Sequence, residues 1–302
     1  MKTYTATSEM QKRVNKVSES MLKVAVPNKG SLSEHARTML LSAGYRQRTD
    51  SKELTLIDPD HNVEFYYLRP RDIAIYVGRG DLDVGITGRD MLLDSRAAAT
   101  EIMALGFGGS KFRFAAPASS GIDEQSLEGK RIATSYAGLL DAYLAKHQVS
   151  AEIVELDGAV ESAIRLGVAD VVADVVDTGT TLRKAGLSLF GDPICVSEAV
   201  LIEREGLDTK EHAVKALQTR LQSVMVAQNY FMMDYNVAAE QLDATLELAP
   251  GVDGPTVSSL AKDGWYAVRA LVPRKGAHLL MDQLYEAGAR GILLTDLAAC
   301  RL

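Results

Sequence analysis

Short apolar segments alternate with amphipathic ones along the first two-thirds of the chain. Segments with the length and composition of buried strands lie at 22–26, 63–68, 84–87, 131–134, 153–156 and 171–173. Segments with apolar positions at helical spacing lie between them, at 32–43, 70–78, 137–147 and 159–166. Strands that alternate with helices in this way predict mostly parallel, doubly wound α/β sheets.

A weak internal repeat predicts two such sheets. The segment Gly80–Thr87 and the segment Gly167–Asp174 both run glycine, two residues, aspartate and then an apolar strand. We therefore expect two similar lobes that face a cleft. Lobe one should comprise residues 21–111 and 195–208, and lobe two residues 112–194, with crossings near 112–116 and 198–202.

The pattern changes after Gly206. A long helix is predicted at 210–230, followed by a strand at 231–235, a helix at 237–246, strands at 256–261 and 265–272, a helix at 277–287 and a strand at 292–295. The order β-α-β-β-α-β is that of a ferredoxin-like unit. Residues 209–302 should therefore form a separate α+β domain.

Composition excludes several classes of protein. The formal charge of −7 over 302 residues argues against a general nucleic-acid binder, which needs a basic surface. The two cysteines, Cys195 and Cys300, make no disulfide framework, and the five histidines show no ligand spacing for structural zinc. No apolar run approaches the ~20 residues that a membrane helix needs.

The first twenty residues are polar and lack the apolar core of a signal peptide. We expect residues 1–20 to be a disordered extension, and the protein to be cytoplasmic.

A loop after the strand at 171–173 carries the strongest chemical signal. Asp174 should lie at the carboxyl end of that strand, where open α/β sheets bind ligands. Asp177, Thr178, Gly179, Thr180 and Thr181 follow as a tight loop that opens a helix. Backbone N–H groups, hydroxyls and the helix dipole there suit a phosphate, and Asp174 suits a ribose diol or a water-held magnesium ion. Alternatively, Thr178 only caps a helix and Asp174 only ends a strand.

The whole stretch from Glu161 to Leu182 resembles the signature of the ATP phosphoribosyltransferases. Further similarity lies at Val24–Gly30, Asp83–Asp90, Arg131–Tyr136 and Arg269–Pro273. The resemblance covers essentially Met21 to Leu302. It implies a two-lobed catalytic unit of the type II periplasmic-binding-protein-like fold, followed by an ACT-like regulatory domain.

The resemblance also implies an activity. Adenine N1 of ATP would attack C1′ of phosphoribosyl pyrophosphate and expel pyrophosphate, with Mg²⁺ required, as the first step of histidine biosynthesis. L-Histidine would inhibit from the tail domain, and the chain would form a homo-oligomer, from dimer to hexamer. No activated serine or cysteine is needed, because the nucleophile is a lone pair of the base.

Residue roles follow from the same resemblance. Catalysis is expected at Lys29, Arg69, Glu161 and Asp174; phosphoribosyl pyrophosphate binding at Asp174 and at 177–181; ATP binding at Lys29, Arg69, Arg71, Asp90, Ser110 and Tyr136; histidine binding at Asn236, Val252, Thr256, Leu271 and Gly291. Read without the resemblance, Arg69 and Arg71 are solvated charges at a helix start, Tyr136 is a core aromatic and Glu161 is a first-turn helix acid.

Two other functions fit parts of the pattern. Two α/β lobes around a cleft also describe solute receptors, but the tail domain opposes that interpretation. A prephenate dehydratase likewise joins two lobes to an amino-acid-sensing domain, but its Thr-Arg-Phe tripeptide is missing from the sequence.

Overall fold

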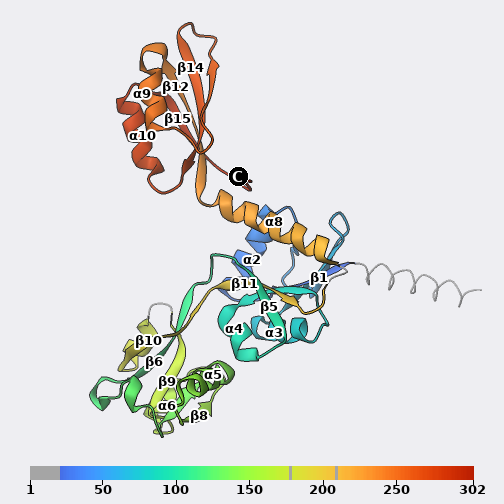
Figure 1. Cartoon of the computed structure of the whole chain (residues 1–302), viewed down its shortest axis with the longest axis vertical. Helices are drawn as coiled ribbons and strands as arrows, with labels where there is room; N and C mark the ends of the chain where they lie inside the picture. The colour runs from blue at the N-terminus through green and yellow to red at the C-terminus, as the bar shows by residue number, and fades with distance from the viewer. Residues whose placement is uncertain (1–20, 177–178, 208–209) are drawn as a thin grey trace, which may run out of the picture. The chain divides into compact units, whose positions relative to one another are not determined.

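The structure is a computed structural model that describes residues 21–176, 179–207 and 210–302. The extension expected at 1–20 lies outside these residues. The chain divides into two compact units (Figure 1). Unit 1 contains the residues through Thr38 and Tyr45–Lys215, and unit 2 contains Met39–Gly44 and Ala216–Leu302.

The first sheet of unit 1 is built around β1, whose apolar residues are almost fully buried. The described residues form six strands in the order β2-β3-β1-β4-β11-β5. The strands are β1 (Leu22–Pro27), β2 (Thr55–Asp58), β3 (Val63–Leu68), β4 (Val84–Gly88), β5 (Ala99–Ala104) and β11 (Ala199–Arg204). The helices that accompany them are α2 (Ser31–Ser42), α3 (Pro70–Gly78) and α4 (Arg89–Ser95). Pro70 starts α3 as predicted, because a missing N–H costs nothing in the first helical turn.

The second sheet of unit 1 follows the order β10-β6-β9-β7-β8 among the described residues. Its strands are β6 (Ser110–Pro117), β7 (Arg131–Thr134), β8 (Glu152–Glu155), β9 (Val171–Val176) and β10 (Leu187–Ser197). Its helices are η1 (Ala118–Ser120), η2 (Glu124–Ser126), α5 (Ala137–His147), α6 (Ser162–Arg165) and α7 (Thr180–Lys184). The residues expected at the crossings lie in strands: 112–116 lie within β6, which follows β5 of the first sheet, and most of 198–202 lies within β11, which follows β10 of the second sheet. Phe112 and Phe114 explain the first case, because both are fully buried on one face of β6.

The two sheets of unit 1 share one topology. β3-β1-β4 is a parallel triplet, and β8-β7-β9 is its counterpart. In each sheet two antiparallel strands follow on the same side, β11 then β5 in the first and β6 then β10 in the second. The two-lobed, periplasmic-binding-protein-like fold that the resemblance implies is therefore confirmed. The domain boundaries expected from the sequence stay a prediction.

The internal repeat has a physical cause, which is an aspartate that joins neighbouring parallel strands. Asp83 donates its backbone N–H to the carbonyl of Lys23 at 3.0 Å and accepts the N–H of Lys23 on Oδ2 at 2.9 Å. Asp170 makes the same two bonds with Arg131, at 2.9 Å and 3.0 Å. The shared aspartate thus fixes how each second strand enters its sheet.

Unit 2 contains most of α8 (Glu211–Ala227) and a four-stranded antiparallel sheet in the order β13-β14-β12-β15. The elements after α8 are β12 (Tyr230–Ala238), η4 (Ala239–Gln241), α9 (Leu242–Leu248), β13 (Thr256–Ser259), β14 (Trp265–Pro273), α10 (Ala277–Glu286) and β15 (Arg290–Asp296). Their order confirms the ferredoxin-like unit. Figure 1 shows α9 and α10 on one face of this sheet.

Several boundaries in unit 2 differ from the prediction, and those around β12 differ most. The long helix ends at Ala227 rather than at residue 230, and the helix expected from 237 begins at Leu242. The reason lies in β12, whose alternating Met233, Tyr235 and Val237 are all buried against the helices. Because the alternation of buried and exposed residues continues through Val237, the strand remains extended to that point. The free energy gained by this burial outweighs the local helix propensity.

Asp83 also anchors the end of unit 1. Its Oδ2 accepts the ammonium of Lys210 at 2.7 Å, and its Oδ1 accepts Nε of Arg204 at 3.1 Å. Burial by itself raises the pKa of this carboxyl, but hydrogen bonds from Lys210, the Lys23 backbone and Arg204 lower the pKa below its ordinary value overall. Stability from this group is therefore present above the unfolded pKa of about 3.9 and is lost as the pH falls through the lowered, folded value.

We expect Asp83→Asn to lower the free energy of unfolding of unit 1 by about 3 kcal/mol at pH 7, because it leaves two partly buried cations without their carboxylate. Urea unfolding at pH 7 and at pH 3 measures the effect, which should shrink at the lower pH. Asp81→Asn is the control, because Asp81 is half exposed and its ion pair with Arg79, at 3.4 Å, lies at the surface. Equal losses in the two variants would contradict this role of Asp83.

Candidate functional site

A cavity of about 250 Å³ lies where β9 leads into α7. Residues that line it are Glu161, Asp174, Val175, Val176, Gly179, Thr180, Thr181 and Leu182. Gly179 has a φ of +69°, in the left-handed region that favours glycine, and it immediately precedes α7. Asp177 and Thr178 lie outside the described residues. The structure thus brings the other members of the predicted phosphoribosyl pyrophosphate site to one cavity.

The electrostatics of this cavity centre on Asp174. Burial raises the pKa of its carboxyl above the ordinary value, and the charge of Glu161 adds to the rise, while the Val175 N–H and Arg71 oppose it. A carboxylate in this setting gains from a cation or from hydroxyl donors. The cavity lining therefore combines two carboxylates, those of Asp174 and Glu161, with a helix start that carries two threonine hydroxyls.

Tyr136 occupies the position just before α5 and is buried, with 8% of its surface exposed. The guanidinium of Arg71 lies over its ring, 4.6 Å from the centroid, and Phe112 packs against it at 5.5 Å. Burial raises the pKa of the Tyr136 phenol, and the negative charge of Asp90 raises it further. Tyr136 is therefore a neutral aromatic platform beside a cation and a carboxylate.

Asp90 is buried and held by a residue that sequence reasoning missed. The Ser197 hydroxyl donates to Oδ1 of Asp90 at 2.8 Å, and the same hydroxyl oxygen accepts the Asp90 N–H at 3.0 Å. Ser197 is opposite Ser110 in the pairing of β10 with β6. Ser110, a predicted ATP residue, therefore lies one strand away from the bond that fixes Asp90. A separation of 107 residues between Asp90 and Ser197 left no local signal for this contact.

Asp94 joins the two lobes, and the sequence did not indicate it. Tyr136 precedes α5 without a side-chain capping bond, so the helix needs another acceptor for its first N–H groups. Oδ1 of Asp94, at the end of α4, accepts the N–H groups of Gly138 and Leu139 at 2.9 Å and 3.1 Å. Oδ2 accepts Arg71 at 2.9 Å. One carboxylate of lobe one thus caps a helix of lobe two and orients the cation that lies on Tyr136.

Gly138 allows this close approach. A Cβ atom at Gly138 would lie 2.1 Å from the carbonyl oxygen of Asp94, so any larger residue would push α4 and α5 apart. An exposed ion pair between Arg96, just after α4, and Asp141 of α5 also joins these two helices. The two lobes therefore meet at a tightly packed contact, with Tyr136 and Arg71 beside it.

Lys29 and Arg69 are exposed and lie apart from these contacts. Lys29 follows β1 in a turn. The side chain of Arg48 fixes the backbone of this turn by donating a hydrogen bond to the carbonyl of Asn28 at 3.0 Å. Arg69 has an extended backbone just before α3. The structure places both at the carboxyl ends of parallel strands, β1 and β3, which is the edge where open α/β sheets bind ligands.

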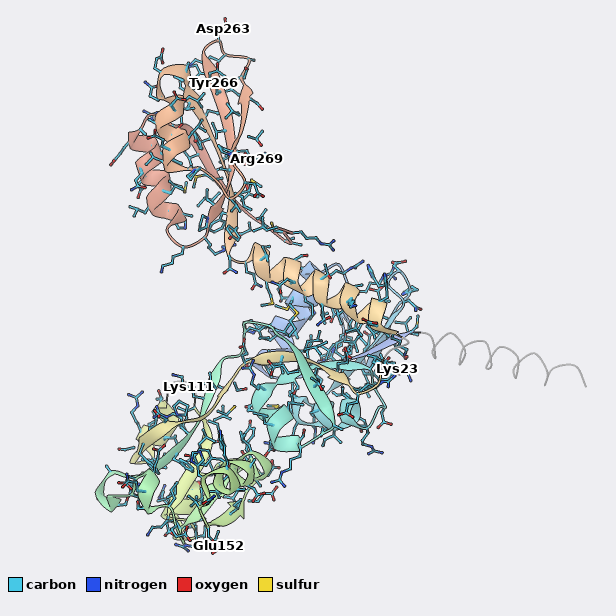
Figure 2. The ribbon with its side chains drawn as sticks, viewed as in Figure 1. Lys23, Lys111, Glu152, Asp263, Tyr266 and Arg269 are labelled. Atoms are coloured by element: carbon cyan, nitrogen blue, oxygen red, sulfur yellow. The ribbon has the colours of Figure 1, made fainter. Side chains whose placement is uncertain are left out.

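Four of the predicted histidine residues lie on one face of the sheet in unit 2. Asn236, Thr256, Leu271 and Gly291 alternate with the residues that pack against α9 and α10, so they share the uncovered face. Val252 lies in the loop after α9. Asp234 and Arg269 form an ion pair at 2.7 Å on the same face, and Figure 2 labels Arg269. A Cβ at Gly291 would come within 3.3 Å of the Asn236 amide nitrogen, so the glycine leaves this amide accessible.

Comparisons with known proteins assign the chain to a family. The sequence profile described as ATP phosphoribosyltransferase matches residues 69–223, and the profile described as HisG, C-terminal domain matches residues 227–299. An ATP phosphoribosyltransferase of Streptomyces coelicolor is 58% identical over 287 residues, covering 93% of this chain and all of the relative. One from Pseudarthrobacter chlorophenolicus is 57% identical over 284 residues, with the same coverage.

A solved structure gives the same assignment. It is described as an ATP phosphoribosyl transferase (HisG:HisZ) complex from Thermotoga maritima, with a TM-score of 0.58 and 28% identity. The similarity covers 67% of this chain and 97% of that chain.

The fold and the site define a transferase of two periplasmic-binding-protein-like lobes with a C-terminal regulatory domain of ferredoxin-like topology. The chain belongs to the ATP phosphoribosyltransferase family, whose members act in histidine biosynthesis. Among the described residues, no helix is long and apolar enough to cross a membrane.

Proposed function

We propose that the enzyme transfers the 5-phosphoribosyl group of phosphoribosyl pyrophosphate to N1 of ATP. A bond forms between adenine N1 and C1′ of the ribose, and the bond from C1′ to the pyrophosphate oxygen breaks with its electron pair leaving on pyrophosphate. The products are N1-(5-phosphoribosyl)-ATP and pyrophosphate. The barrier arises from positive character at C1′, so alignment and charge complementarity are the means of catalysis.

The position of Arg71 is the observation that carries this proposal. Its guanidinium lies over Tyr136, and its charge also acts on the carboxyl of Asp174. The aromatic platform for adenine and the acidic cavity for a ribose phosphate are therefore neighbours in unit 1. Two substrates bound in these places would bring a base and a sugar carbon together.

Each group has a role in this scheme. Thr178, Gly179, Thr180 and Thr181, with Asp177, bind the 5-phosphate, and Asp174 binds the ribose hydroxyls. Tyr136 stacks on adenine while Asp90 and Ser110 contact its edge. Lys29, Arg69 and Arg71 bind the phosphates of ATP and the departing pyrophosphate, whose charge grows as the bond to C1′ breaks. Glu161 shares the cavity with Asp174 and adds negative charge near the sugar.

Magnesium fits the donor set of this cavity. Mg²⁺ prefers oxygen ligands and is usually held by one or two carboxylates together with substrate phosphates. Asp174 and Glu161 both line the cavity, and no cluster of three or more metal-binding side chains occurs among the described residues. Asp174 would hold the ion, directly or through water, and the ion would neutralise charge on the pyrophosphate.

The uncovered face of the sheet in unit 2 is proposed to serve both regulation and assembly. The uncovered sheet face of unit 2 carries Asn236, Thr256, Leu271 and Gly291, which would bind L-histidine together with Val252. Leu293 on the same face is 61% exposed, and Met232 and Leu271 are partly exposed beside it. A contiguous apolar patch of this kind marks a surface for protein contacts. We infer a homo-oligomer in which these tail domains meet, with the enzyme acting in the cytoplasm.

Thr181→Ala tests the phosphate loop. It removes a hydroxyl donor to a dianion, so the KM for phosphoribosyl pyrophosphate should rise about tenfold or more, from a loss of ~1.5–3 kcal/mol. The KM for ATP should stay near its original value. The assay follows the absorbance of the N1-ribosylated adenine, with Ser188→Ala as control, since Ser188 is exposed and outside the cavity lining. An equal rise for both substrates, or no turnover of this substrate pair by the parent enzyme, would contradict the assignment.

Asn236→Ala and Thr256→Ala test the histidine site. Each variant should weaken inhibition by L-histidine, because it removes a contact to the inhibitor. Uninhibited turnover should stay nearly unchanged, because the histidine site is distinct from the catalytic site and acts on it only through a coupling of ~1–3 kcal/mol. Inhibition of the parent should not be competitive with phosphoribosyl pyrophosphate. Histidine titration of the variants beside Ser259→Ala is the measurement, because Ser259 lies next to Ser258 on β13 and points to the other face. Unaltered inhibition in both test variants would place the sensor elsewhere.

A further inference from the structure

The chain passes between the two lobes of unit 1 at two crossings (Figure 1). The first crossing, residues 105–109, leads from β5 of the first sheet to β6 of the second, and the second crossing is Glu198, the single residue between β10 and β11. Backbone hydrogen bonds join the two. The carbonyl of Ala199 accepts the N–H of Leu105 at 2.9 Å, and the Ala199 N–H donates to the carbonyl of Phe107 at 2.8 Å. The crossings therefore lie side by side.

One side chain, that of Arg89 at the start of α4, binds this region of the chain. Its Nε and Nη2 donate to the two carboxylate oxygens of Glu101 on β5, at 2.8 Å and 2.7 Å. Nη1 and Nη2 also donate to Oε1 of Glu198, at 3.4 Å and 3.3 Å. The other oxygen of Glu198, Oε2, accepts the N–H of Gly106 in the first crossing at 3.0 Å. The guanidinium of Arg89 thus connects α4 to both crossings.

Arg89 also holds the residues on either side of Ser197. Nη1 of Arg89 donates to the carbonyl of Val196 at 3.2 Å, and the Arg89 N–H donates to the carbonyl of Glu198 at 3.0 Å. The hydroxyl between these two anchors is the one that accepts the Asp90 N–H and donates to Oδ1 of Asp90. The position of the Asp90 carboxylate therefore depends on Ser197, and the position of Ser197 depends on Arg89.

The bonds of Arg89 are strong enough to fix a position. A guanidinium has five N–H donors, and the five hydrogen bonds to Glu101, Glu198 and Val196 use all of them. The side chains of Arg89, Glu101 and Glu198 are 24%, 29% and 30% exposed. The hydrogen bond with Glu101 raises the pKa of Arg89, partial burial lowers it, and Glu198 raises it again. Bidentate pairs between arginine and carboxylate are both stronger and geometrically more specific than neutral hydrogen bonds.

We propose that Arg89 is a positioning residue for ATP: it fixes Ser197 from both sides, and Ser197 in turn holds the Asp90 carboxylate at the edge of the adenine. This inference rests on the proposed function, in which Asp90 and Ser110 contact the adenine. Ser110 begins β6 directly after the first crossing and is opposite Ser197. Both adenine contacts therefore lie beside segments that Arg89 organises, while Arg89 itself spends its donors on protein acceptors and not on the nucleotide.

Arg89→Met tests this role beside a matched control, Arg131→Met. The Arg131 guanidinium also makes a bidentate pair, with Asp170, and also donates to a backbone carbonyl, that of Gly167. Both variants should lose stability, but only Arg89→Met should weaken ATP binding, about tenfold by calorimetry on the full-length protein, because a charge-assisted contact to the adenine is misplaced. The KM for phosphoribosyl pyrophosphate should stay near its parental value in both.

A double-mutant cycle with Ser197→Ala shows whether Arg89 acts through Ser197. Each single variant should weaken ATP binding about tenfold, and the double variant should bind no more weakly than the weaker single, because the second change removes a contact that the first has already disrupted. Independent effects would multiply to about a hundredfold. Arg89→Lys keeps the charge beside both glutamates but has only three donors, so its ATP affinity should lie between those of Arg89→Met and the parent.

Three results would overturn the proposal: equal ATP affinity in Arg89→Met and Arg131→Met, multiplying losses in the cycle, or an equal rise of the KM values for both substrates. If Arg89→Met does not fold, Arg89→Lys takes its place in the cycle, and parental ATP affinity in Arg89→Lys overturns the proposal in the same way. A parent enzyme that does not bind ATP would overturn the proposed function together with this inference. ATP binding by the parent with any of the other results overturns the inference alone.

Discussion

The carboxylate of Asp94 caps a helix that belongs to the other lobe, and the geometry of the proposed site depends on this bond. A helix start leaves N–H groups without partners, and a side chain at the capping position normally accepts one or two of them. Tyr136 occupies that position in α5 and has no acceptor to offer there. Asp94 supplies the acceptor from lobe one, so the requirement of a single helix end becomes a connection between lobes.

Several consequences follow from that cap. Tyr136 need not cap the helix, because another residue performs the capping, and its ring packs against Arg71 and Phe112 instead. The second oxygen of Asp94 aligns Arg71, which lies over the ring and acts electrostatically on Asp174. Groups of the proposed site on both sides of the lobe contact are therefore organised by one partly buried acid, and Gly138 keeps the contact short. Asp83 plays a related part elsewhere in unit 1, where it joins strands instead of lobes.

Much of the fold could be predicted from local patterns. Val63–Leu68, Arg131–Thr134 and Ala137–His147 have the predicted bounds, because apolar periodicity and flanking glycines or prolines mark them. The residues of the proposed phosphate loop, from Asp174 to Thr181, are contiguous, so a signature within one segment contained them. The strand at β12 was placed less well, because burial of Tyr235 and Val237 by later elements decides where it ends.

The contacts that complete the site could not be predicted in this way. Asp94 and Gly138 are 44 residues apart, and Asp90 and Ser197 are 107 apart. Nothing in either neighbourhood distinguishes a capping aspartate from a solvated one, since the distinction lies wholly in what the fold brings beside it. The same is true of Arg89, which meets a glutamate 109 residues away where the chain crosses between the lobes.

The most direct test of the role of Asp94 is the dissociation constant for ATP in Asp94→Ala, measured by calorimetry beside Asp94→Asn. Asparagine caps helices about as well as aspartate but carries no charge for Arg71, whereas loss of a cap costs about 1 kcal/mol. Our account predicts that Asp94→Ala weakens ATP binding about tenfold, because both the platform and its cation lose their anchor. Asp94→Asn should lie between alanine and the parent. An unchanged dissociation constant in Asp94→Ala, accompanied only by a lower melting temperature, would contradict it.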